Sequence, residues 1–294
     1  MAPCSPLTIK VVNGSIIVMS VKSDGSGRRS LELEFEVPGT PEQVWQAIAT
    51  GPGISSWLFP TEVEEREGGA VAFHIGPGME STGTVTAWEP PHRFAYEEPE
   101  WCPNAPPLAT EFVVEARSGG TCVVRLVHSL FGSSDEWDDQ IDGVESGWPA
   151  FFRVLRLYLT HFFGQRCSGI RVMGKAGGTE SDAWDALSAA LGLTGAAKGQ
   201  RRSASGAGFP PIAGIVERVG EGTYVHELTL LLDEPAPGVA LVGAYTWGGH
   251  VHTAISFYLF GERGTEAVAR YESKWRMWMD AQFPAEPVSA GSTN

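Results

Sequence analysis

The chain has 294 residues, of which 43 % are hydrophobic, and it carries a formal net charge of −14. This length and apolar content allow two modest domains with real cores. Because a nucleic-acid surface needs clustered Lys and Arg, the acidic balance argues against a nucleic-acid partner. No apolar run reaches the roughly 20 residues of a membrane span, and the first residues do not resemble a signal peptide, so we expect no membrane partner.

Residues 1–29 are predicted to be an N-terminal extension and linker. Thr8–Met19 fits a short hairpin that turns at Asn13-Gly14, and the Ser/Gly-rich stretch 20–30 favours a flexible linker. Met19 is an alternative to Met1 as the first residue, and the sequence leaves both open.

Residues 30–164 are predicted to form one α+β domain. Leu31–Val37 alternates apolar and acidic residues, which indicates a half-buried strand. Thr40 and Pro41 suit the N-cap and first position of a helix, and a second short helix is expected at 54–59. Turn signals then separate six expected strands, at 61–65, 70–75, 83–88, 93–96, 109–115 and 121–130. Their short connections imply an antiparallel meander.

The stretch 136–163 is predicted to be a long helix with one aromatic face. Apolar residues recur at steps of three and four: Trp137, Ile141, Val144, Trp148, Phe151, Leu155, Tyr158 and Phe162. Pro149 should kink the helix or mark a joint near Trp148. Because such a face must be buried, we expect the preceding sheet to curve around this helix.

Residues 165–286 are predicted to be a second, diverged copy of the same domain, followed by a disordered tail at 287–294. Strands are expected at 169–173, 212–219, 223–232, 238–245 and 251–260, with a closing helix at 262–283. Gly178-Thr179 and Trp184 repeat Gly39-Thr40 and Trp45 at a spacing of 139 residues. The pairs Phe131-Gly132 and Phe260-Gly261, and the motifs Glu145-Ser146-x-Trp148 and Glu272-Ser273-x-Trp275, form a second echo in the same order. Two ordered echoes indicate a duplication.

A Gly/Ser/Ala-rich segment, 194–209, is predicted to be a mobile loop. It contains Lys198, Arg201 and Arg202 in an acidic protein. It is either a surface insertion or a lid or electrostatic contact for an acidic partner.

The first half resembles the SRPBCC superfamily (START and Bet v 1-like, helix-grip fold), in the branch named for the activator of the heat-shock-protein-90 ATPase. The resemblance covers about residues 31–163. It is carried by Pro41-x-x-Val44-Trp45, Ile54-x-x-Trp57-Leu58, Gly68-Gly69-Ala70-Val71-Ala72-Phe73, Gly83-x-Val85, Pro90-x-x-Arg93-Phe94, Gly119-Gly120-Thr121, Leu126-x-His128 and Gly147-Trp148. The second half fits more loosely, because it lacks the Ile-x-x-Trp-Leu and Gly-Gly motifs.

The resemblance implies a cavity between the sheet and the long helix that holds a small hydrophobic or amphipathic ligand. The candidate lining residues are Trp57, Phe59, Phe73, Trp88, Phe94, Tyr96, Phe112, His128, Trp148, Phe151 and Phe152. The alternative for each aromatic residue is that it simply packs in the core.

Few residues are candidates for chemistry. No GxSxG, HExxH, P-loop or dinucleotide motif is present. His128 and Tyr96 are weak candidates for acid–base roles, with Glu98 and Glu100 as carboxylates; for His128 the alternative is a satisfied histidine near the sheet edge. His74 should point to the opposite sheet face. His250 and His252 share a strand face but have no evident third ligand, so neither a metal nor a cofactor is expected.

The sequence therefore predicts a tandem helix-grip protein whose first domain binds a small hydrophobic molecule without catalysis. One alternative is a cyclase- or hydrolase-like enzyme that uses the same cavity. Another is a chaperone-associated interaction module. The second domain could close the cavity or form a homodimer surface. Four scattered cysteines without a Cys-x-x-Cys pair favour a reducing compartment, and hence a cytoplasmic location: Cys4, Cys102, Cys122 and Cys167.

Overall fold

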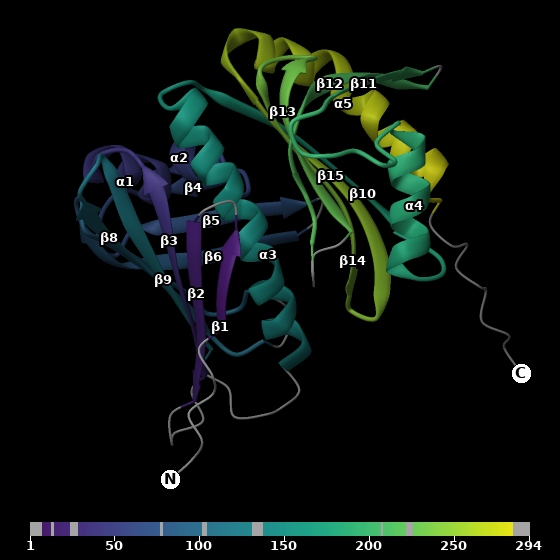
Figure 1. Ribbon diagram of the computed structural model, residues 1–294. Coiled ribbons are helices and arrows are strands. Elements are labelled where there is room, and N and C mark those ends of the chain that lie inside the picture. Colours follow the sequence, from purple (N-terminus) through teal and green to yellow (C-terminus); the bar gives the residue numbers. More distant parts are fainter. Residues whose placement is uncertain are drawn as a thin grey trace, which may run out of the picture. The chain divides into compact units, whose positions relative to one another are not determined.

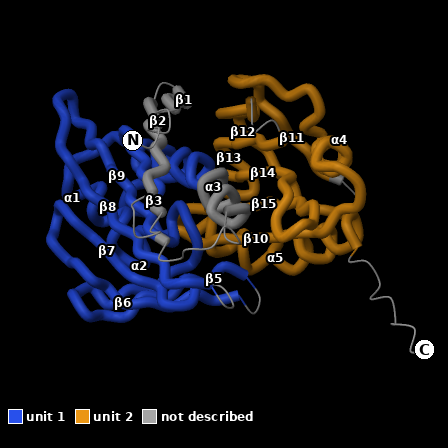
Figure 2. The backbone as a smooth tube through the Cα atoms, turned by 90° about the horizontal axis from the view of Figure 1, so that it is seen from below, with its two compact units in different colours: residues 1–166 blue, residues 167–294 orange. Residues whose placement is uncertain are grey.

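The computed structural model describes residues 8–12, 15–23, 29–76, 79–101, 105–130, 138–206, 208–221 and 226–284. The chain divides into two compact units, residues 1–166 and 167–294 (Figure 2). None of the helices in the described part of the chain is long and apolar enough to cross a membrane.

The first unit is an antiparallel sheet of nine strands with a long helix after its last strand (Figure 1). Its strands are β1 (Thr8–Val12), β2 (Ser15–Ser23), β3 (Arg29–Pro38), β4 (Thr61–Val63), β5 (Ala70–Gly76), β6 (Met79–Glu89), β7 (Arg93–Glu98), β8 (Leu108–Arg117) and β9 (Thr121–Leu130). Its helical segments are α1 (Pro41–Ala49), α2 (Gly51–Ile54), α3 (Asp138–Leu157) and a π-helical turn, η2 (Tyr158–Phe162). The α+β class and the antiparallel meander expected from the sequence are confirmed.

The N-terminal residues join this sheet. The expected hairpin is present, with Thr8 paired to Met19. However, β2 also pairs with β3, from Val18↔Glu34 to Ser23↔Arg29, so part of the expected linker is strand. Ser and Lys made residues 20–23 resemble a linker, but Val21 pairs with Leu31 in the ladder, and tertiary pairing outweighs the local composition.

The short second helix begins earlier than predicted, and the long helix includes Pro149. The short second helix begins at Gly51 rather than Ile54, because the Thr50 hydroxyl accepts a hydrogen bond from the Gly53 N–H at 3.1 Å and caps it there. The long helix α3 continues through Pro149, and its backbone pattern changes only at Tyr158. The side chains of Trp137, Ile141 and Val144 lie outside the described residues.

The second unit is a six-stranded antiparallel sheet with α5 packed against it. Its elements are β10 (Cys167–Ala176), α4 (Glu180–Ala190), β11 (Arg201–Gly206), β12 (Phe209–Val219), β13 (Glu227–Glu234), β14 (Gly238–Trp247), β15 (His250–Phe260) and α5 (Gly261–Gln282). Trp275 and Met279 of α5 and Phe257 of β15 are fully buried in its core.

Both units share one topology. In each, the strand that opens the domain pairs with the last strand, and the other strands follow in reverse order. The orders are β3-β9-β8-β7-β6-β5-β4 and β10-β15-β14-β13-β12-β11. Each sheet is followed by a helix. The structure therefore contains two successive helix-grip sheets, of which the second lacks one strand and one short helix.

The repeated Gly-Thr motif has the same role in both units. Thr40 and Thr179 are N-caps whose hydroxyls accept hydrogen bonds from the backbone N–H of Gln43 and Asp182. The Gln43 and Asp182 side chains bond back to the N-cap N–H and complete a capping box in each unit.

We expect Thr40→Ala and Thr179→Ala each to lower stability by about 1 kcal/mol, because each removes an N-cap. Hydrogen exchange of the α1 and α4 amides under increasing urea measures this loss. Thr→Ser, which keeps a capping hydroxyl, is the control and should have little effect. Equal protection in the Ala and Ser variants would contradict the capping role.

The segment expected to be a mobile loop contains an edge strand. Arg201–Ala204 pair with Ile215–Ile212 of β12. The Arg201 guanidinium pairs with the Asp233 carboxylate, and Arg202 donates to the carbonyl oxygen of Gly195 at 2.9 Å. Backbone pairing thus outweighs the loop-like composition, and Arg201 is already engaged within its own unit.

Candidate functional site

A row of polar side chains crosses the interior face of the first sheet. His128 of β9 pairs with Thr110 of β8, and Thr110 pairs with Tyr96 of β7. Side chains alternate between the two faces of a strand, so Tyr96 and Glu98 point to the same face. Tyr96 and Glu98 are buried, whereas Glu97 between them is exposed. Four polar side chains thus face the interior on three adjacent strands.

His128 lies between the sheet and α3. Its Nδ1 is 2.9 Å from the Thr110 hydroxyl, and its ring meets the Trp148 ring edge-on at 5.6 Å between centroids. Burial lowers the pKa of His128 to about 4. The imidazole is therefore neutral at pH 7, with one nitrogen that donates and one that accepts. β9 lies between β3 and β8, so His128 is not at the edge of the sheet.

Tyr96 is buried among aromatic rings. Its ring is 5.2 Å from that of Phe73 and 5.4 Å from that of Phe94. Burial, and to a lesser extent the charge of Glu98, raise the pKa of Tyr96 well above 10, although a hydrogen bond with Thr110 opposes the shift. Tyr96 is therefore a neutral hydroxyl that can donate a hydrogen bond.

Glu98 is a carboxyl group inside the domain, with 6 % of its surface exposed. Ser81 of β6 donates a hydrogen bond to its Oε1. Burial raises the pKa of Glu98 to about 7, although the Ser81 bond opposes the shift. Gly83 lies against this residue: a Cβ there would stand 2.4 Å from the Glu97 carbonyl oxygen and 3.2 Å from Glu98 Cγ. Glycine at this position therefore leaves room for the carboxyl side chain.

Aromatic rings from the sheet, from α3 and from the turn after α2 surround the polar row. Trp57 is fully buried, and its ring lies 6.2–6.4 Å from those of Phe112, Trp148 and Phe152. The Trp57 Nε1 donates to the Ala47 carbonyl oxygen at 2.8 Å. Seven predicted lining residues thus form one contiguous group: Trp57, Phe94, Tyr96, Phe112, His128, Trp148 and Phe152.

The other predicted lining residues lie at the margins of this group. Phe73 packs on Tyr96, Phe59 packs on Phe151, and Trp88 packs on Trp45 of α1 and on Phe94. Phe59, Trp88 and Phe151 keep part of their surface exposed. Glu100, an alternative carboxylate, is exposed in the turn after β7 and does not join the interior row.

Sequence reasoning missed Ser81 and Thr110. Thr110 shares its strand face with Phe112, so the alternation along β8 could have revealed it. Ser81 shares its strand face with the buried Val85 and Ala87, so the alternation along β6 could have revealed it as well.

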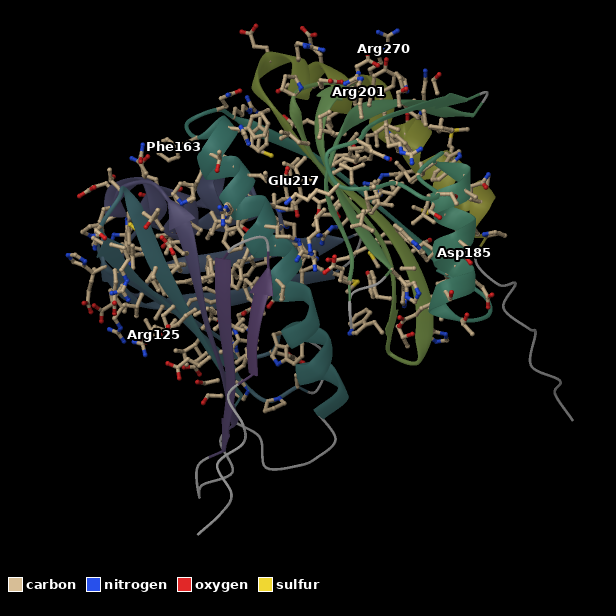
Figure 3. All side chains as sticks on the ribbon, in the orientation of Figure 1. Arg125, Phe163, Asp185, Arg201, Glu217 and Arg270 are labelled. Atoms are coloured by element: carbon tan, nitrogen blue, oxygen red, sulfur yellow. The ribbon has the colours of Figure 1, made fainter. Side chains whose placement is uncertain are left out.

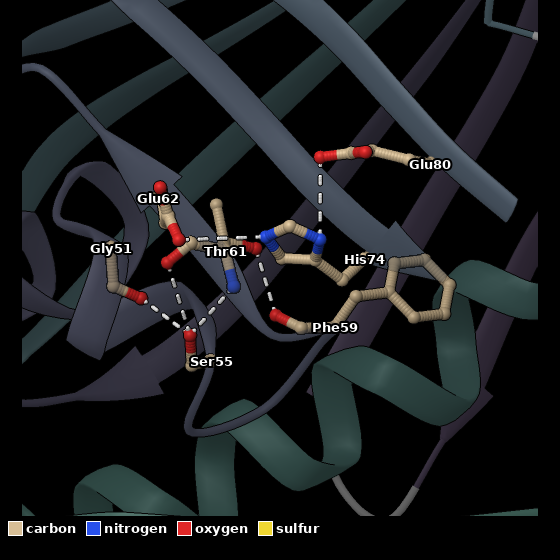
Figure 4. A network of polar contacts seen from close by, with 7 residues as sticks. All are labelled: Gly51, Ser55, Phe59, Thr61, Glu62, His74 and Glu80. Atoms are coloured by element: carbon tan, nitrogen blue, oxygen red, sulfur yellow. Dashed lines mark hydrogen bonds and ion pairs between the residues drawn. The ribbon is translucent and has the colours of Figure 1, made fainter. Parts of the chain in front are cut away.

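The outer face of the first sheet is charged and paired. His74 lies between Glu62 and Glu80, with nitrogen–oxygen separations of 3.7 and 3.4 Å (Figure 4). Arg125, labelled in Figure 3, pairs with Glu32 at 3.3 Å. The exposed position of His74 agrees with the prediction that it points away from the interior.

In the part of the chain that the structure describes, the histidine pair of the second unit has no third metal ligand beside it. The His252 Nε2 lies 3.3 Å from the Trp247 carbonyl oxygen, and its ring stacks on Tyr245 at 5.7 Å. Within the described ranges, no group of three His, Cys, Asp or Glu side chains could hold a metal ion.

The second unit is apolar where the first has its polar row. The Phe-Gly pairs near the end of the last strand of each unit, Phe131-Gly132 and Phe260-Gly261, are 129 positions apart. The same spacing makes Phe257 of β15 the counterpart of His128 of β9. The register then matches the row His128, Thr110, Tyr96 to the row Phe257, Ala240, Leu230. The contact with the helix is kept, because the Phe257 ring is 4.9 Å from that of Trp275, the counterpart of Trp148. Glu98 corresponds to the buried Leu232.

The two equivalent tryptophans share one further property. The Nε1 atoms of Trp148 and Trp275 are buried and have no hydrogen-bond partner. In the first unit this N–H belongs to a ring that contacts His128, whereas in the second its ring contacts Phe209, Phe257 and Trp278.

Comparison with known proteins gives one family match. Residues 38–160 match the family described as "Activator of Hsp90 ATPase homolog 1-like protein". No curated protein matches the chain.

Several solved structures are similar. CalU16 from Micromonospora echinospora is 19 % identical over 50 % of this chain and 87 % of its own, with a TM-score of 0.40. The di-domain ARO/CYC BexL, from the BE-7585A biosynthetic pathway, is 13 % identical over 88 % of this chain and 100 % of its own, with a TM-score of 0.42. The Aha1 dimer from Colwellia psychrerythraea is 19 % identical over 46 % of this chain and 98 % of its own, with a TM-score of 0.39.

Proposed function

Because residues 38–160 belong to the SRPBCC superfamily, in the family of activator-of-Hsp90-ATPase homologues, we propose that the first unit binds a small hydrophobic or amphipathic molecule. The molecule lies between the sheet and α3, against the aromatic rings. Its polar group meets the row formed by Tyr96, Thr110 and His128, and the N–H of Trp148.

The contrast between the two units carries this proposal. Both units build the same sheet and keep the tryptophan of the closing helix. Only the first places His128, Thr110 and Tyr96 where the second has Phe, Ala and Leu. The fold therefore does not need a polar row at this position.

The energetics point the same way. A buried polar group has to find a hydrogen-bond partner, because without one it costs about 1–3 kcal/mol, and His128, Thr110 and Tyr96 supply partners for one another. An apolar residue of similar shape has no such requirement. Polar groups that the fold does not need are typical of ligand sites, where a few of them orient a molecule held by apolar walls.

The decisive experiment converts the polar row of the first unit into its counterpart in the second. We expect the triple variant His128→Phe, Thr110→Ala, Tyr96→Leu to fold, because Phe, Ala and Leu occupy the equivalent row. We expect it to bind 1-anilinonaphthalene-8-sulfonate, an apolar probe with one polar group, at least about tenfold more weakly than the unchanged chain.

Fluorescence titration of the probe measures the affinity, and circular dichroism checks the fold. His74→Phe, on the outer face of the same sheet, is the matched control and should bind the probe as the unchanged chain does. Native mass spectrometry of the purified protein, followed by solvent extraction, identifies any molecule carried along. Equal affinity of the triple variant and the control would refute the proposed site.

The interaction-module alternative is less well supported in the first unit. Among the residues of this unit whose exposure the structure describes (30–76, 79–101, 105–129 and 147–166), Met79 is the one large hydrophobic residue with strong exposure, at 41 %. A protein-docking face normally offers a contiguous apolar patch. Tyr96 and Thr110, by contrast, are buried, so a protein docked on the surface would not reach them.

A further inference from the structure

We propose that the first unit also catalyses proton transfer, with the Glu98 carboxylate as the base that removes a hydrogen from the carbon next to a carbonyl group. The substrate class is an apolar molecule with one ketone or ester carbonyl and a hydrogen on the adjacent carbon. This inference rests on the proposed ligand site and adds a reaction to it.

The position of Glu98 is the first argument. Its side chain is buried on the same strand face as Tyr96, two residues away, whose ring packs on those of Phe73 and Phe94. Ser81 donates to Oε1 and fixes the orientation of the carboxyl group, while the structure gives Oε2 no such bond. The equivalent residue of the second unit is Leu232, so the fold does not require a carboxyl group there.

The donors around it are the second argument. Tyr96 carries a neutral hydroxyl and lies on the same strand face as Glu98, two residues away. The Thr110 hydroxyl is hydrogen-bonded to both His128 and Tyr96, so it connects the two ends of the polar row. Donors that are already buried and oriented stabilise a developing oxyanion better than water does, because they need no reorganisation.

The proposed step is balanced as follows. The carbon–hydrogen bond of the substrate breaks and an O–H bond forms on Glu98. The electron pair of the broken bond forms the carbon–carbon double bond of an enolate, and the negative charge moves to the carbonyl oxygen, to which Tyr96 donates. Return of the proton to the same carbon, or to a conjugated one, restores a carbonyl compound and the carboxylate. Nothing is oxidised or reduced.

The acidity of Glu98 suits this role. A general base works best when its pKa lies near the working pH, because it is then both ionised and basic. Burial raises the pKa of Glu98 to about 7, whereas an exposed glutamate is a much weaker base.

The experiment follows deuterium uptake by 2-tetralone, an apolar bicyclic ketone, in D2O by proton NMR, with saturation-transfer difference spectra to detect binding. We expect the unchanged chain to accelerate exchange at the carbons next to the carbonyl. Glu98→Gln, which keeps shape and the Ser81 bond, should lose at least about 100-fold of this acceleration while still binding the ketone. Glu97→Gln, on the exposed face of the same strand, is the matched control and should keep the full rate.

The outcomes separate the two proposals. Binding of 2-tetralone without faster exchange would overturn proton transfer and leave the ligand site standing. Faster exchange that persists in Glu98→Gln would overturn the role of Glu98. Absence of binding by the unchanged chain would count against the ligand site itself, and proton transfer would fall with it.

Discussion

Glu98→Gln should raise the free energy of unfolding of the first unit by about 3 kcal/mol at pH 8, and by less than about 1 kcal/mol at pH 5. The reason is that Glu98 has a pKa of about 7 in the folded chain and an ordinary value of 4.5 when exposed. Between these values the folded state holds a proton that the unfolded state has released. Stability therefore falls as the pH rises from 4.5 to 7, and glutamine, which does not titrate, removes this loss.

His128 makes stability change with pH in the opposite direction, so the unchanged chain and the variant must be compared at each pH. Its pKa is lowered to about 4 in the folded chain, so its contribution to stability is lost as the pH falls from 6.5 towards 4. Both the unchanged chain and Glu98→Gln keep His128, and its effect cancels in their difference.

Urea unfolding followed by hydrogen exchange of β7–β9 peptides, at pH 5 and pH 8, measures the difference in the first unit alone. Glu97→Gln should show no comparable pH-dependent gain, because Glu97 is exposed. If Glu98→Gln gained the same stability at both pH values, Glu98 would not titrate with a raised pKa.

Much of the fold could be predicted because its signals are local and repeated. The alternation Leu31, Leu33, Phe35, Val37 gives a strand with one buried face, as observed. The Gly-Thr echo, which indicated a duplication, falls at two equivalent helix starts, and both carry a capping box. The errors fell at 20–23 and 201–206, where polar composition suggested loops but pairing with a neighbouring strand decided the structure.

The candidate site was predicted only in part, because its pattern lies across strands rather than along them. The aromatic residues were found from the resemblance and from the period of the helix. The row of His128, Thr110 and Tyr96 depends on the register between β7, β8 and β9, which brings together residues that are far apart in the sequence. The burial of Glu98 follows from the same register and from Gly83, and neither is visible in composition.

Trp57→Ala should lower the stability of the first unit by about 3–5 kcal/mol, the cost of removing a large side chain that packs fully. Trp57 is fully buried, and its ring contacts Phe112 of the sheet and two rings of α3. Its loss would also leave the Ala47 carbonyl oxygen without the indole bond. Hydrogen exchange of β8, β9 and α3 peptides under increasing urea measures the effect.

This variant also decides whether Trp57 packs or lines a ligand cavity. A residue that lines a cavity already has unfilled space beside it, so its removal loses fewer contacts than removal from a filled core. Trp88→Ala is the matched control. Because Trp88 is partly exposed, we expect this substitution to lower the free energy of unfolding by less than Trp57→Ala does. If Trp57→Ala lowered the free energy of unfolding by less than about 2 kcal/mol, Trp57 would not be fully packed and would line the ligand site. If it lowered this free energy by about 3–5 kcal/mol, Trp57 would be a core residue, and Tyr96, His128 and Trp148 would be the residues that meet the ligand.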